Sequence, residues 1–383
     1  MRILQVIPFY TSRGGGSVSV AYNLSKELAR RGHDITVITS DYEFDDVLAS
    51  ITIAEGVEVI PFRCVLNYAA FLVTPSLRRW LDVNIGDFEV VHLHNYRSYQ
   101  NLEVSISSTR NHVPYVVQAH GSLARIVNSR TQKLLFDLAW GNKLLRQAKA
   151  AIAVTNWESR EYERFGVEAS AIVEIPNAVE DLQAHAPAVH GTLKSTLGIK
   201  EEKKVILYLG RIHKRKGIEH VVEAFDNLRT KRDDSVLVIA GLDDGYGVKL
   251  KKLVKAKGLQ DMVKFTGFIT NASEAYEDSD LVVYPARHEA FGLVPLEAIL
   301  HGKPVIAAED IGSGDIIKKC HGGLLVGYGN TPALEEAIVR ILDDLDTYKQ
   351  LALQGGEYIR KELNWKKIAD RYERLYFRCA DRI

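Results

Sequence analysis

Short apolar segments alternate with helical patterns along almost the whole chain, and no other feature constrains the fold as strongly. In the first half, the segments predicted as strands are rich in Val and Ile: 2–8, 34–39, 57–61, 90–94, 115–120 and 150–155. A helix is predicted over 17–31, where Val20, Leu24 and Leu28 recur at a helical period, and another over 131–149. Continuous apolar strands are typical of a parallel sheet covered by helices on both faces.

The second half repeats this rhythm. Strands are predicted at 205–210, 236–240, 263–266, 281–284 and 304–307, and helices at 218–230, 292–300, 332–344 and 365–378. A polar stretch over 180–204, with Pro187, Gly191 and Gly198, has no strong period and is interpreted as a linker. A chain of 383 residues is long enough to form two domains of ordinary size. We therefore predict an α/β protein with two Rossmann-like, doubly wound parallel-sheet domains facing across a cleft, with residues 1–179 and 180–364 as the two domains.

Charge, cysteine content and the lengths of apolar runs argue against several classes of protein. Forty-nine basic and forty-nine acidic residues cancel, so no overall field favours nucleic acid. Cys64, Cys320 and Cys379 are scattered and odd in number, which suits a reducing cytoplasm better than a disulfide framework or a zinc site. The N-terminal apolar run is too short for a signal peptide, and no run reaches the length of a membrane span. We expect a cytoplasmic protein that can still visit the inner face of a membrane.

A basic loop follows the predicted strand 205–210 and contains Arg211 and Lys216 next to Gly217. The Arg fork and the Lys point charge can both neutralise phosphate oxygens, and the start of the following helix adds partial positive charge. This pattern suits a diphosphate. The alternative is a solvated basic turn.

Two glutamates, Glu289 and Glu297, lie eight positions apart after the predicted strand 281–284. Phe291, Gly292 and Leu293 begin a helix between them, so unpaired backbone N–H groups can meet an anion there. Carboxylates accept hydrogen bonds from hydroxyl pairs. We expect Glu297 to project from the helix toward a vicinal diol such as ribose, and Glu289 to bind a sugar hydroxyl. The alternative is a helix N-terminal acid plus a surface glutamate.

Two features of the first half could also meet a ligand. The run Gly14-Gly15-Gly16 follows the first strand, and such a loop lets the backbone approach a charged group, although it matches neither the P-loop nor the Gly-x-Gly-x-x-Gly pattern. His120 ends the predicted strand 115–120, so it is expected at the ligand-binding edge of the sheet. The alternative is a structural role, which is the more frequent one for a lone histidine at a strand end.

A metal site is not predicted. Asp278 and Asp280 form an Asp-x-Asp pair, but they precede the strand 281–284 and therefore lie at the wrong end of the sheet.

One region of the first half is basic. Residues 63–149 contain eleven Lys or Arg and five Asp or Glu, a net charge of +6 in a neutral chain. Within it, residues 68–81 mix bulky apolar residues with Arg78 and Arg79. Such a segment suits anionic lipid headgroups or a lipid-linked acceptor. The alternative, a core-packing helix with a solvated face, is slightly favoured.

These motifs, taken together and in this order, resemble the retaining glycosyltransferases of family GT4, which have the GT-B fold. The resemblance extends over nearly the whole chain. It is carried by the glycine loop, His120-Gly121, Ile175-Pro-Asn177, Gly210-Arg211 with Lys216-Gly217, Phe265-Thr-Gly-Phe268 and the Glu289–Glu297 pair. The last segment, 365–383, resembles the helix that returns to the first domain in this family. Two departures are Ala178 after Pro-Asn and the Gly312-Ser-Gly314-Asp315 sequence.

The resemblance implies a role for each residue of the donor site. Glu297 would bind the ribose of the donor, Arg211 and Lys216 its diphosphate, and Glu289 a sugar hydroxyl. The other implied donor contacts are Phe291, Gly292 and Leu293 at the phosphate and sugar, Phe268 and Ile269 beside the nucleobase, and Gly15 and Gly16 at the diphosphate. His120 would contact the transferred sugar.

The implied reaction moves a sugar from a nucleoside-diphosphate sugar to an acceptor hydroxyl of a glycan, a small molecule or a lipid-linked compound, with retention and without metal or cofactor. Attack on the same face as the leaving group is favoured over a double displacement through Glu289. Rival interpretations are a sugar-nucleotide epimerase or phosphorylase of the same architecture and a non-catalytic nucleotide-sugar sensor. A phosphorylase would need a lysine that anchors pyridoxal phosphate, and the sequence offers no convincing candidate.

Overall fold

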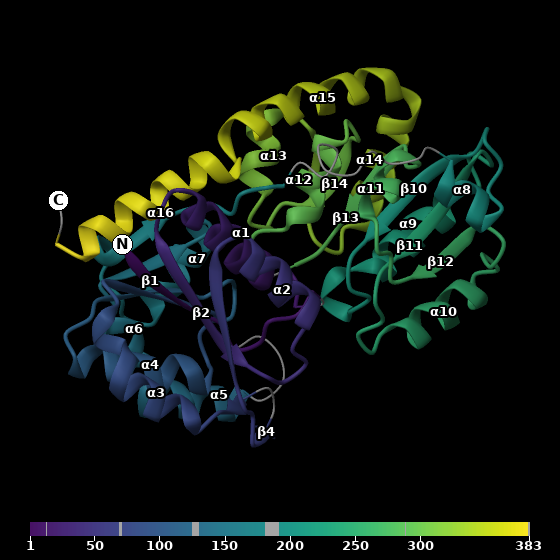
Figure 1. Ribbon diagram of the computed structural model, residues 1–383. Coiled ribbons are helices and arrows are strands. Elements are labelled where there is room, and N and C mark those ends of the chain that lie inside the picture. Colours follow the sequence, from purple (N-terminus) through teal and green to yellow (C-terminus); the bar gives the residue numbers. More distant parts are fainter. Residues whose placement is uncertain (13, 69–70, 125–129, 181–190, 288, 382–383) are drawn as a thin grey trace. The chain divides into compact units, whose positions relative to one another are not determined.

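The computed structural model describes residues 1–12, 14–68, 71–124, 130–180, 191–287 and 289–381 (Figure 1). The chain divides into two compact units: unit 1 is Met1–Ala178 with Trp365–Ile383, and unit 2 is Val179–Asn364. Three predicted features lie partly outside the described residues. They are positions 181–190 of the predicted linker, positions 69–70 and 125–129 of the basic region, and positions 382–383 of the last helix.

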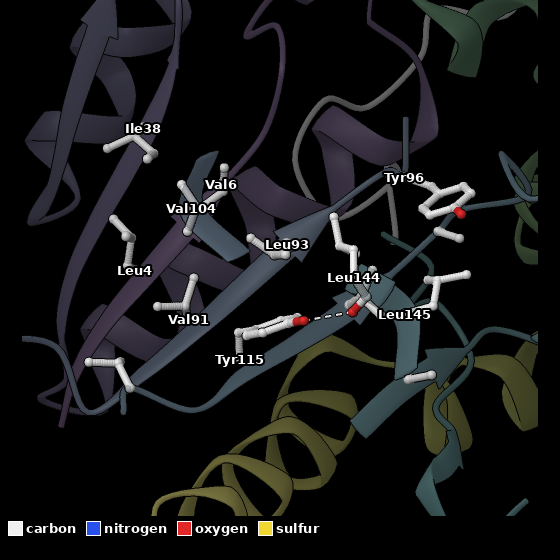
Figure 2. Close-up of a cluster of buried hydrophobic side chains, with 14 of the residues drawn as sticks. Leu4, Val6, Ile38, Val91, Leu93, Tyr96, Val104, Tyr115, Leu144 and Leu145 are labelled. Atoms are coloured by element: carbon white, nitrogen blue, oxygen red, sulfur yellow. Dashed lines mark hydrogen bonds between the residues drawn. The ribbon is translucent and has the colours of Figure 1, made fainter. Parts of the chain in front are cut away.

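Unit 1 contains a seven-stranded parallel sheet in the order β3-β2-β1-β6-β7-β8-β9. Its strands are β1 (Arg2–Val6), β2 (Asp34–Ser40), β3 (Val57–Phe62), β6 (Val90–His94), β7 (Tyr115–Gln118), β8 (Ala150–Ala153) and β9 (Ile172–Glu174). Their apolar side chains are buried between layers of helices, and Figure 2 shows Leu4, Val91 and Tyr115 in this core. The Tyr115 hydroxyl donates to the carbonyl of Leu144 at 2.6 Å, which ties a covering helix to the sheet (Figure 2).

Eight α-helices are described in unit 1. They are α1 (Gly16–Arg30), α2 (Asp46–Ala54), α3 (Ser76–Asn84), α4 (Tyr99–Arg110), α5 (Arg130–Phe136), α6 (Asn142–Gln147), α7 (Asn156–Arg164) and α16 (Trp365–Cys379). The last helix, α16, packs beside α1, where the Arg31 guanidinium contacts Asp370 at 2.5 Å and Glu373 at 3.1 Å. The predicted helix 131–149 forms, but a π-helical turn, Asp137–Gly141, separates α5 from α6.

The segment 68–81 is not one helix. It contributes to an antiparallel hairpin of β4 (Leu66–Tyr68) and β5 (Phe71–Val73), followed by the start of α3. Leu72, Leu77 and Leu81 are buried and the side chains of Arg78 and Arg79 are exposed, so apolar residues of this stretch do pack on the core, but from a hairpin and the start of a helix and not from the single helix of the favoured interpretation. Within the described ranges, no helix is both long enough and apolar enough to cross a membrane.

Unit 2 contains a six-stranded parallel sheet in the order β12-β11-β10-β13-β14-β15. Its strands are β10 (Lys204–Leu209), β11 (Ser235–Ala240), β12 (Val263–Gly267), β13 (Leu281–Tyr284), β14 (Val305–Ala308) and β15 (Gly323–Val326). Its helices are α8 (Thr192–Leu197), α9 (Ile218–Leu228), α10 (Gly247–Ala256), α11 (Ala272–Glu277), α12 (Leu293–Leu300), α13 (Gly314–Cys320), α14 (Thr331–Asp343) and α15 (Leu345–Glu362). The predicted α/β class, with two doubly wound parallel sheets, is confirmed.

The predicted linker is wrong in one respect, because its described part contains the helix α8. Asp278 stabilises the start of this helix: its carboxylate accepts from the backbone N–H groups of Gly191 at 2.6 Å and Leu193 at 2.7 Å. Asp280 accepts from the N–H of Val205 at 3.0 Å. Both acids of the Asp-x-Asp pair therefore have structural partners. Among the residues that the structure describes, no three His, Cys, Asp or Glu side chains gather as they would around a metal ion.

Each sheet has a point where the strand order reverses. In unit 1, β1 lies between β2 and β6; in unit 2, β10 lies between β11 and β13. Ligands of doubly wound sheets bind beyond the carboxyl ends of the strands at such a point. The loops after β1 and β6, and those after β10 and β13, are therefore where the fold exposes functional groups.

Candidate functional site

The loop after β10 brings Lys216 to the carboxyl end of β13. Residues Lys214–Lys216 form a 3-10 turn that ends at Gly217, whose φ is 65°. A Cβ at Gly217 would lie 2.5 Å from the carbonyl oxygen of Pro285, so only glycine permits this close packing. The backbone thus holds Lys216 against the segment that follows β13.

Lys216 and Glu289 form an ion pair, which brings together two of the predicted site residues. The Lys216 ammonium also donates to the Tyr284 hydroxyl at 2.7 Å. The Lys216 and Glu289 side chains are 12% and 28% exposed, so the pair is partly shielded from water but still reachable by a ligand. In this state the charge of Lys216 is largely balanced by Glu289. An incoming phosphate would therefore compete with Glu289 for the ammonium group.

Two tyrosines that sequence reasoning did not single out support this pair. Tyr284, the last residue of β13, donates to Glu289 at 3.4 Å, and its ring stacks on Tyr208 at 6.2 Å between centroids. The Tyr208 hydroxyl donates to the carbonyl of Arg211 at 2.9 Å. Burial raises the pKa of both tyrosines well above the ordinary value, so both hydroxyls stay protonated. The only sequence signal was their position at or near strand ends.

The helix α12 begins directly after Gly292, which has a φ of 83° and forms the N-cap. Phe291 is buried and therefore anchors the turn. The N–H groups of Leu293 and Val294 belong to the first, unpaired turn of the helix, in which Pro295 has no N–H. The neighbouring loop braces this start, because the N–H of Gly312 donates to the carbonyl of Glu289 at 3.0 Å and that of Ser313 to Phe291 at 2.6 Å. The helix start and Glu289 are thus held as one rigid turn.

Glu297 lies one and a half turns into α12 and is partly buried instead of projecting freely into solvent. Its carboxylate accepts from the hydroxyl of Tyr276, on α11, at 2.8 Å. Burial raises the pKa of Glu297, an effect that the Tyr276 hydrogen bond opposes. The structure therefore adds Tyr276 as a residue that orients this carboxylate. Nothing in the sequence pattern indicated this pairing, which joins the helices that precede and follow β13 along the chain.

Among the described residues, the side chains of Arg211, Phe268 and Ile269 form no direct hydrogen bond or ion pair with Lys216 or Glu289, and Arg211 is linked to the pair only through its backbone carbonyl and the two tyrosines. Arg211 is largely exposed and contacts Asp244 at 3.2 Å. Phe268 and Ile269 follow the edge strand β12, and the Phe268 side chain is 59% exposed. An exposed aromatic ring of this size can stack on a planar ligand. Their predicted donor contacts stay predictions.

In unit 1, the glycine run forms the turn between β1 and α1. Gly15 is the N-cap of α1 with a φ of 72°, and α1 begins at Gly16. A Cβ at Gly14 would lie 2.4 Å from the Val18 side chain, whereas Gly15 has no neighbour within 4 Å of that position. Gly14 is thus required by packing, while Gly15 leaves open space at the start of a helix. The predicted diphosphate contact of Gly15 and Gly16 is untested.

His120 belongs to a buried polar network. The predicted strand 115–120 ends two residues early, at Gln118, because His120 turns away with a φ of 50°. Its Nε2 lies 2.9 Å from Nδ1 of His94, and His94 Nε2 lies 2.6 Å from Oε1 of Gln5. Oε1 can only accept, so His94 Nε2 carries the proton and neutral His94 accepts from His120. This assignment leaves Nδ1 of His120 as an unprotonated acceptor.

The network extends to α16. His92 stacks near His94 at 4.0 Å between ring centroids, and its Nδ1 lies 2.7 Å from the Tyr376 hydroxyl. Tyr372, also on α16, donates to Gln118 at 3.0 Å. The returning helix therefore completes the polar interior beneath the strand ends that carry His94 and His120.

Glu158, on α7, fixes the turn after His120. Its carboxylate accepts from the N–H of Gly121 at 2.6 Å and of Val154 at 2.9 Å. Burial raises the pKa of Glu158 to about 7 in spite of these two hydrogen bonds. Sequence reasoning did not single out this residue.

The histidine network predicts loss of stability in acid. Burial lowers the pKa of His92 and His94 well below the ordinary value, and that of His120 to about 3. Below about pH 6.5 the unfolded chain binds protons that the native network excludes, so stability falls by up to about 1.4 kcal/mol per pH unit for each histidine. Because the pKa of Glu158 is raised, this residue makes the protein more stable as the pH falls from about 7 to about 4.5. This opposite contribution is the same in all the variants compared.

The measurement is urea unfolding between pH 8 and 5.5 for the wild type, His92→Gln and, as a control, His112→Asn on the exposed surface. His92→Gln is expected to show a shallower pH dependence than the wild type, while the control keeps the wild-type slope. Equal slopes for all three proteins would contradict the assignment of neutral, buried histidines.

Comparisons with known proteins cover both units. The family described as Glycosyltransferase Family 4 matches residues 14–181, and Glycosyl transferases group 1 matches residues 191–358. The chain is 30% identical to alpha-D-kanosaminyltransferase of Streptomyces kanamyceticus over 69% of this chain and 70% of that protein. It is 28% identical to phosphatidyl-myo-inositol mannosyltransferase of Mycobacterium leprae over 98% and 96%. A crystal structure of Anabaena HepE in complex with UDP superposes with a TM-score of 0.81 at 19% identity, covering 98% of this chain and 99% of that one.

Proposed function

The chain belongs to glycosyltransferase family 4, and we propose that it moves a sugar with retention from a nucleoside-diphosphate sugar held by unit 2 to an acceptor hydroxyl. The observation that carries the proposal is the Lys216–Glu289 pair beside the start of α12, at the strand-order reversal of unit 2. A cation, an anion-binding helix start and a carboxylate meet at this place. They match the diphosphate and the hydroxyl groups of such a donor.

Each part of the donor has a group to bind it. Lys216 and the N–H groups at the start of α12 take the diphosphate, and Arg211 joins them after leaving Asp244. Glu297, oriented by Tyr276, accepts from the ribose hydroxyls. When the phosphate takes over Lys216, Glu289 is released to accept from a hydroxyl of the sugar. His120 in unit 1 is proposed to contact the transferred sugar, with Nδ1 as its acceptor atom.

The chemical difficulty of the reaction is the negative charge that develops on the leaving diphosphate. Lys216, Arg211 and the dipole of α12 stabilise this charge without any change of protonation state, so the proposal includes no metal or other cofactor in this step. In same-face attack, the leaving phosphate oxygen accepts the proton of the acceptor hydroxyl as the new glycosidic bond forms. Glu289 then positions the sugar and forms no covalent bond.

The acceptor is proposed to be a hydroxyl of a glycan, a small molecule or a lipid-linked compound, and contact with a membrane is part of the lipid-linked alternative. The named relatives include one named for the transfer of an alpha-D-kanosaminyl group and one named as a mannosyltransferase of phosphatidyl-myo-inositol. The names of these relatives have glycosyl transfer in common but differ in the groups that they mention. They therefore support the proposed transfer reaction, and the acceptor has to be identified by experiment.

The test is a thermal-shift screen against UDP-, GDP- and ADP-sugars, followed by an assay for sugar transfer or donor hydrolysis. A donor present at about 100 times its dissociation constant stabilises the protein by about 2.7 kcal/mol. We expect one nucleotide class to shift the transition and to be turned over. Binding without any turnover would favour a sensor, and a change of the sugar without transfer would favour an epimerase.

Tyr276→Phe tests the role given to Glu297. The variant removes the hydrogen bond that orients the carboxylate, and bonds to charged groups contribute about 1.5–3 kcal/mol, so the donor dissociation constant should rise about tenfold or more. Turnover at saturating donor should change little. Tyr348→Phe, on α15 of the same unit, is the matched control. Unchanged donor affinity in Tyr276→Phe would remove Glu297 from the donor site.

The pH dependence of donor binding follows from the same residue. Since burial raises the pKa of Glu297, this carboxylate takes up a proton at a higher pH than an ordinary glutamate. Protonation removes an acceptor for the ribose hydroxyls, so affinity should weaken as the pH falls, and Glu297→Gln should lose that dependence.

A further inference from the structure

An apolar surface in unit 1 is not explained by the fold or by the proposed donor site. Among the residues of α5 and the following π-helical turn, Leu135, Leu138 and Trp140 are 61%, 68% and 51% exposed. Leu134, one turn before Leu138, is also exposed. Large apolar side chains scattered singly are ordinary on a protein surface, but a cluster within seven residues of one helix marks an interaction site.

The hairpin β4–β5 extends this surface. Leu66 and Tyr68 of β4 are more than half exposed. The Tyr68 hydroxyl accepts from the side-chain amide of Gln132, on α5, at 3.0 Å, so the strand and the helix are neighbours (Figure 1). We call Leu66, Tyr68, Leu134, Leu135, Leu138 and Trp140 the outer face.

The helix does not need the outer face in order to fold. Its inner side already contributes Phe136, Leu144 and Leu145 to the core, and the side chain of Asp137 is buried there against Arg97. The π-helical turn admits one extra residue per turn, which lets both helical segments, α5 and α6, keep their inner sides on the core. The outer face is therefore an additional apolar surface that the core leaves in contact with solvent.

The charge around the outer face identifies what it can bind. Residues 130–147 contain four cations, Arg130, Lys133, Lys143 and Arg146, and Asp137 is the one acid among them, buried and paired. Leu and Trp side chains flanked by Lys and Arg are the composition of helices that lie in the interface of a bilayer with anionic lipids. A second copy of the chain would bring the same cations face to face in a symmetric dimer, which disfavours self-association.

We propose that the outer face docks unit 1 onto the surface of a membrane that contains anionic lipid. The apolar side chains enter the boundary between headgroups and acyl chains, and the four cations pair with lipid phosphates. The surface shares only Tyr68 with the segment 68–81 expected from sequence, since Leu72, Leu77 and Leu81 pack inside whereas Leu134, Leu135, Leu138 and Trp140 are exposed. Docking does not depend on the transfer reaction, so the two proposals can fail separately.

The test is co-sedimentation with vesicles of phosphatidylcholine alone and of phosphatidylcholine mixed with phosphatidylglycerol. We expect binding to the mixed vesicles that weakens with salt. Leu135→Ser combined with Leu138→Ser should lower the partition coefficient by about tenfold or more, since it removes two apolar side chains that the bilayer would bury. Lys143→Gln should lower it about fivefold on the mixed vesicles only.

Val248→Ser is the matched control, because Val248 is an equally exposed apolar residue on α10 of unit 2. It should bind the vesicles like the wild type. The leucine variant should keep its far-ultraviolet circular dichroism and its thermal shift with the donor, which shows that it is folded. The proposal would be overturned if the wild-type protein did not co-sediment with the mixed vesicles, or if the leucine variant bound them as well as the wild type. Sedimentation velocity measures the oligomeric state. If the wild type is a dimer and the variant with Leu135→Ser and Leu138→Ser is a monomer, the outer face is a surface for self-association and the proposal is overturned.

Discussion

Lys216→Ala is expected to lower turnover by about 10²–10³, the typical cost of removing one electrostatic donor to a developing negative charge. The lysine is held by Glu289 and Tyr284 next to the start of α12, so it contributes its charge where the leaving diphosphate is proposed to lie. Because this charge grows in the transition state, the loss should appear in kcat and not mainly in KM.

Steady-state kinetics with the donor identified by the thermal-shift screen measures the effect. Lys214→Ala is the matched control, since Lys214 belongs to the same 3-10 turn and is exposed. The unfolding transition of Lys216→Ala should stay close to that of the wild type. A loss of less than about fivefold, far below the usual effect of such a donor, would show that this loop does not contact the diphosphate.

Arg97→Met should cost about 3–5 kcal/mol of the free energy of unfolding, the largest stability effect we expect from one substitution. Arg97 forms two hydrogen bonds of 2.8 Å with Asp137, whose side chain has no exposed surface, and it also donates to the carbonyl of Leu123. Removal of the guanidinium leaves a buried carboxylate without its countercharge. The loop after β7 and the π-helical turn would lose their common anchor.

Urea unfolding measures the loss of stability, and two further variants serve as comparisons for its size. Arg30→Met breaks the more exposed pair with Glu55 and should cost no more than about 1 kcal/mol. Arg97→Met combined with Asp137→Asn should recover part of the loss, because the uncompensated charge is then removed. If Arg97→Met costs as little as Arg30→Met, the pair does not stabilise unit 1.

The sheets were predictable from sequence because their strands are continuous apolar runs. The predicted strands 90–94 and 281–284 match β6 and β13 residue for residue. The strands β9 and β15 were missed, since each is short and only partly buried at one end of its sheet. Sequence patterns identify buried strands better than edge strands, whose burial depends on neighbours distant in the chain.

The helix α15 was missed for a different reason. It contains Gly355 and Gly356, and glycine is a poor helix former, so local propensity does not favour a helix there. In the structure both glycines are buried in the helix interior. A Cβ at Gly355 would lie 3.0 Å from the carbonyl oxygen of Cys320, and one at Gly356 would lie 3.1 Å from that of Ile299. Close packing of α15 therefore favours glycine at both positions, although local propensity argues against a helix there.

The candidate site could be predicted in part. Its strand-end position and its charged residues were visible, and the structure does join Lys216 to Glu289. The supporting residues were not visible, because Tyr276 and Tyr284 look like ordinary core aromatics and gain a role only through their hydroxyl partners. Arg211 was predicted as a site residue, but its ion pair with Asp244 was not. Asp244 follows the next strand along the chain, so the sequence alone could not show the pairing.

The most direct test of the donor site is calorimetric titration of the free nucleoside diphosphate into the wild type, Lys216→Met, Glu297→Ala and Glu289→Gln. We expect Lys216→Met and Glu297→Ala each to weaken binding by about tenfold or more, since each removes a charge-assisted hydrogen bond to the ligand. Glu289→Gln should bind the diphosphate at least as tightly as the wild type, because it frees Lys216 from its ion pair. Equal affinity in all four proteins would contradict the assignment of this site to the donor.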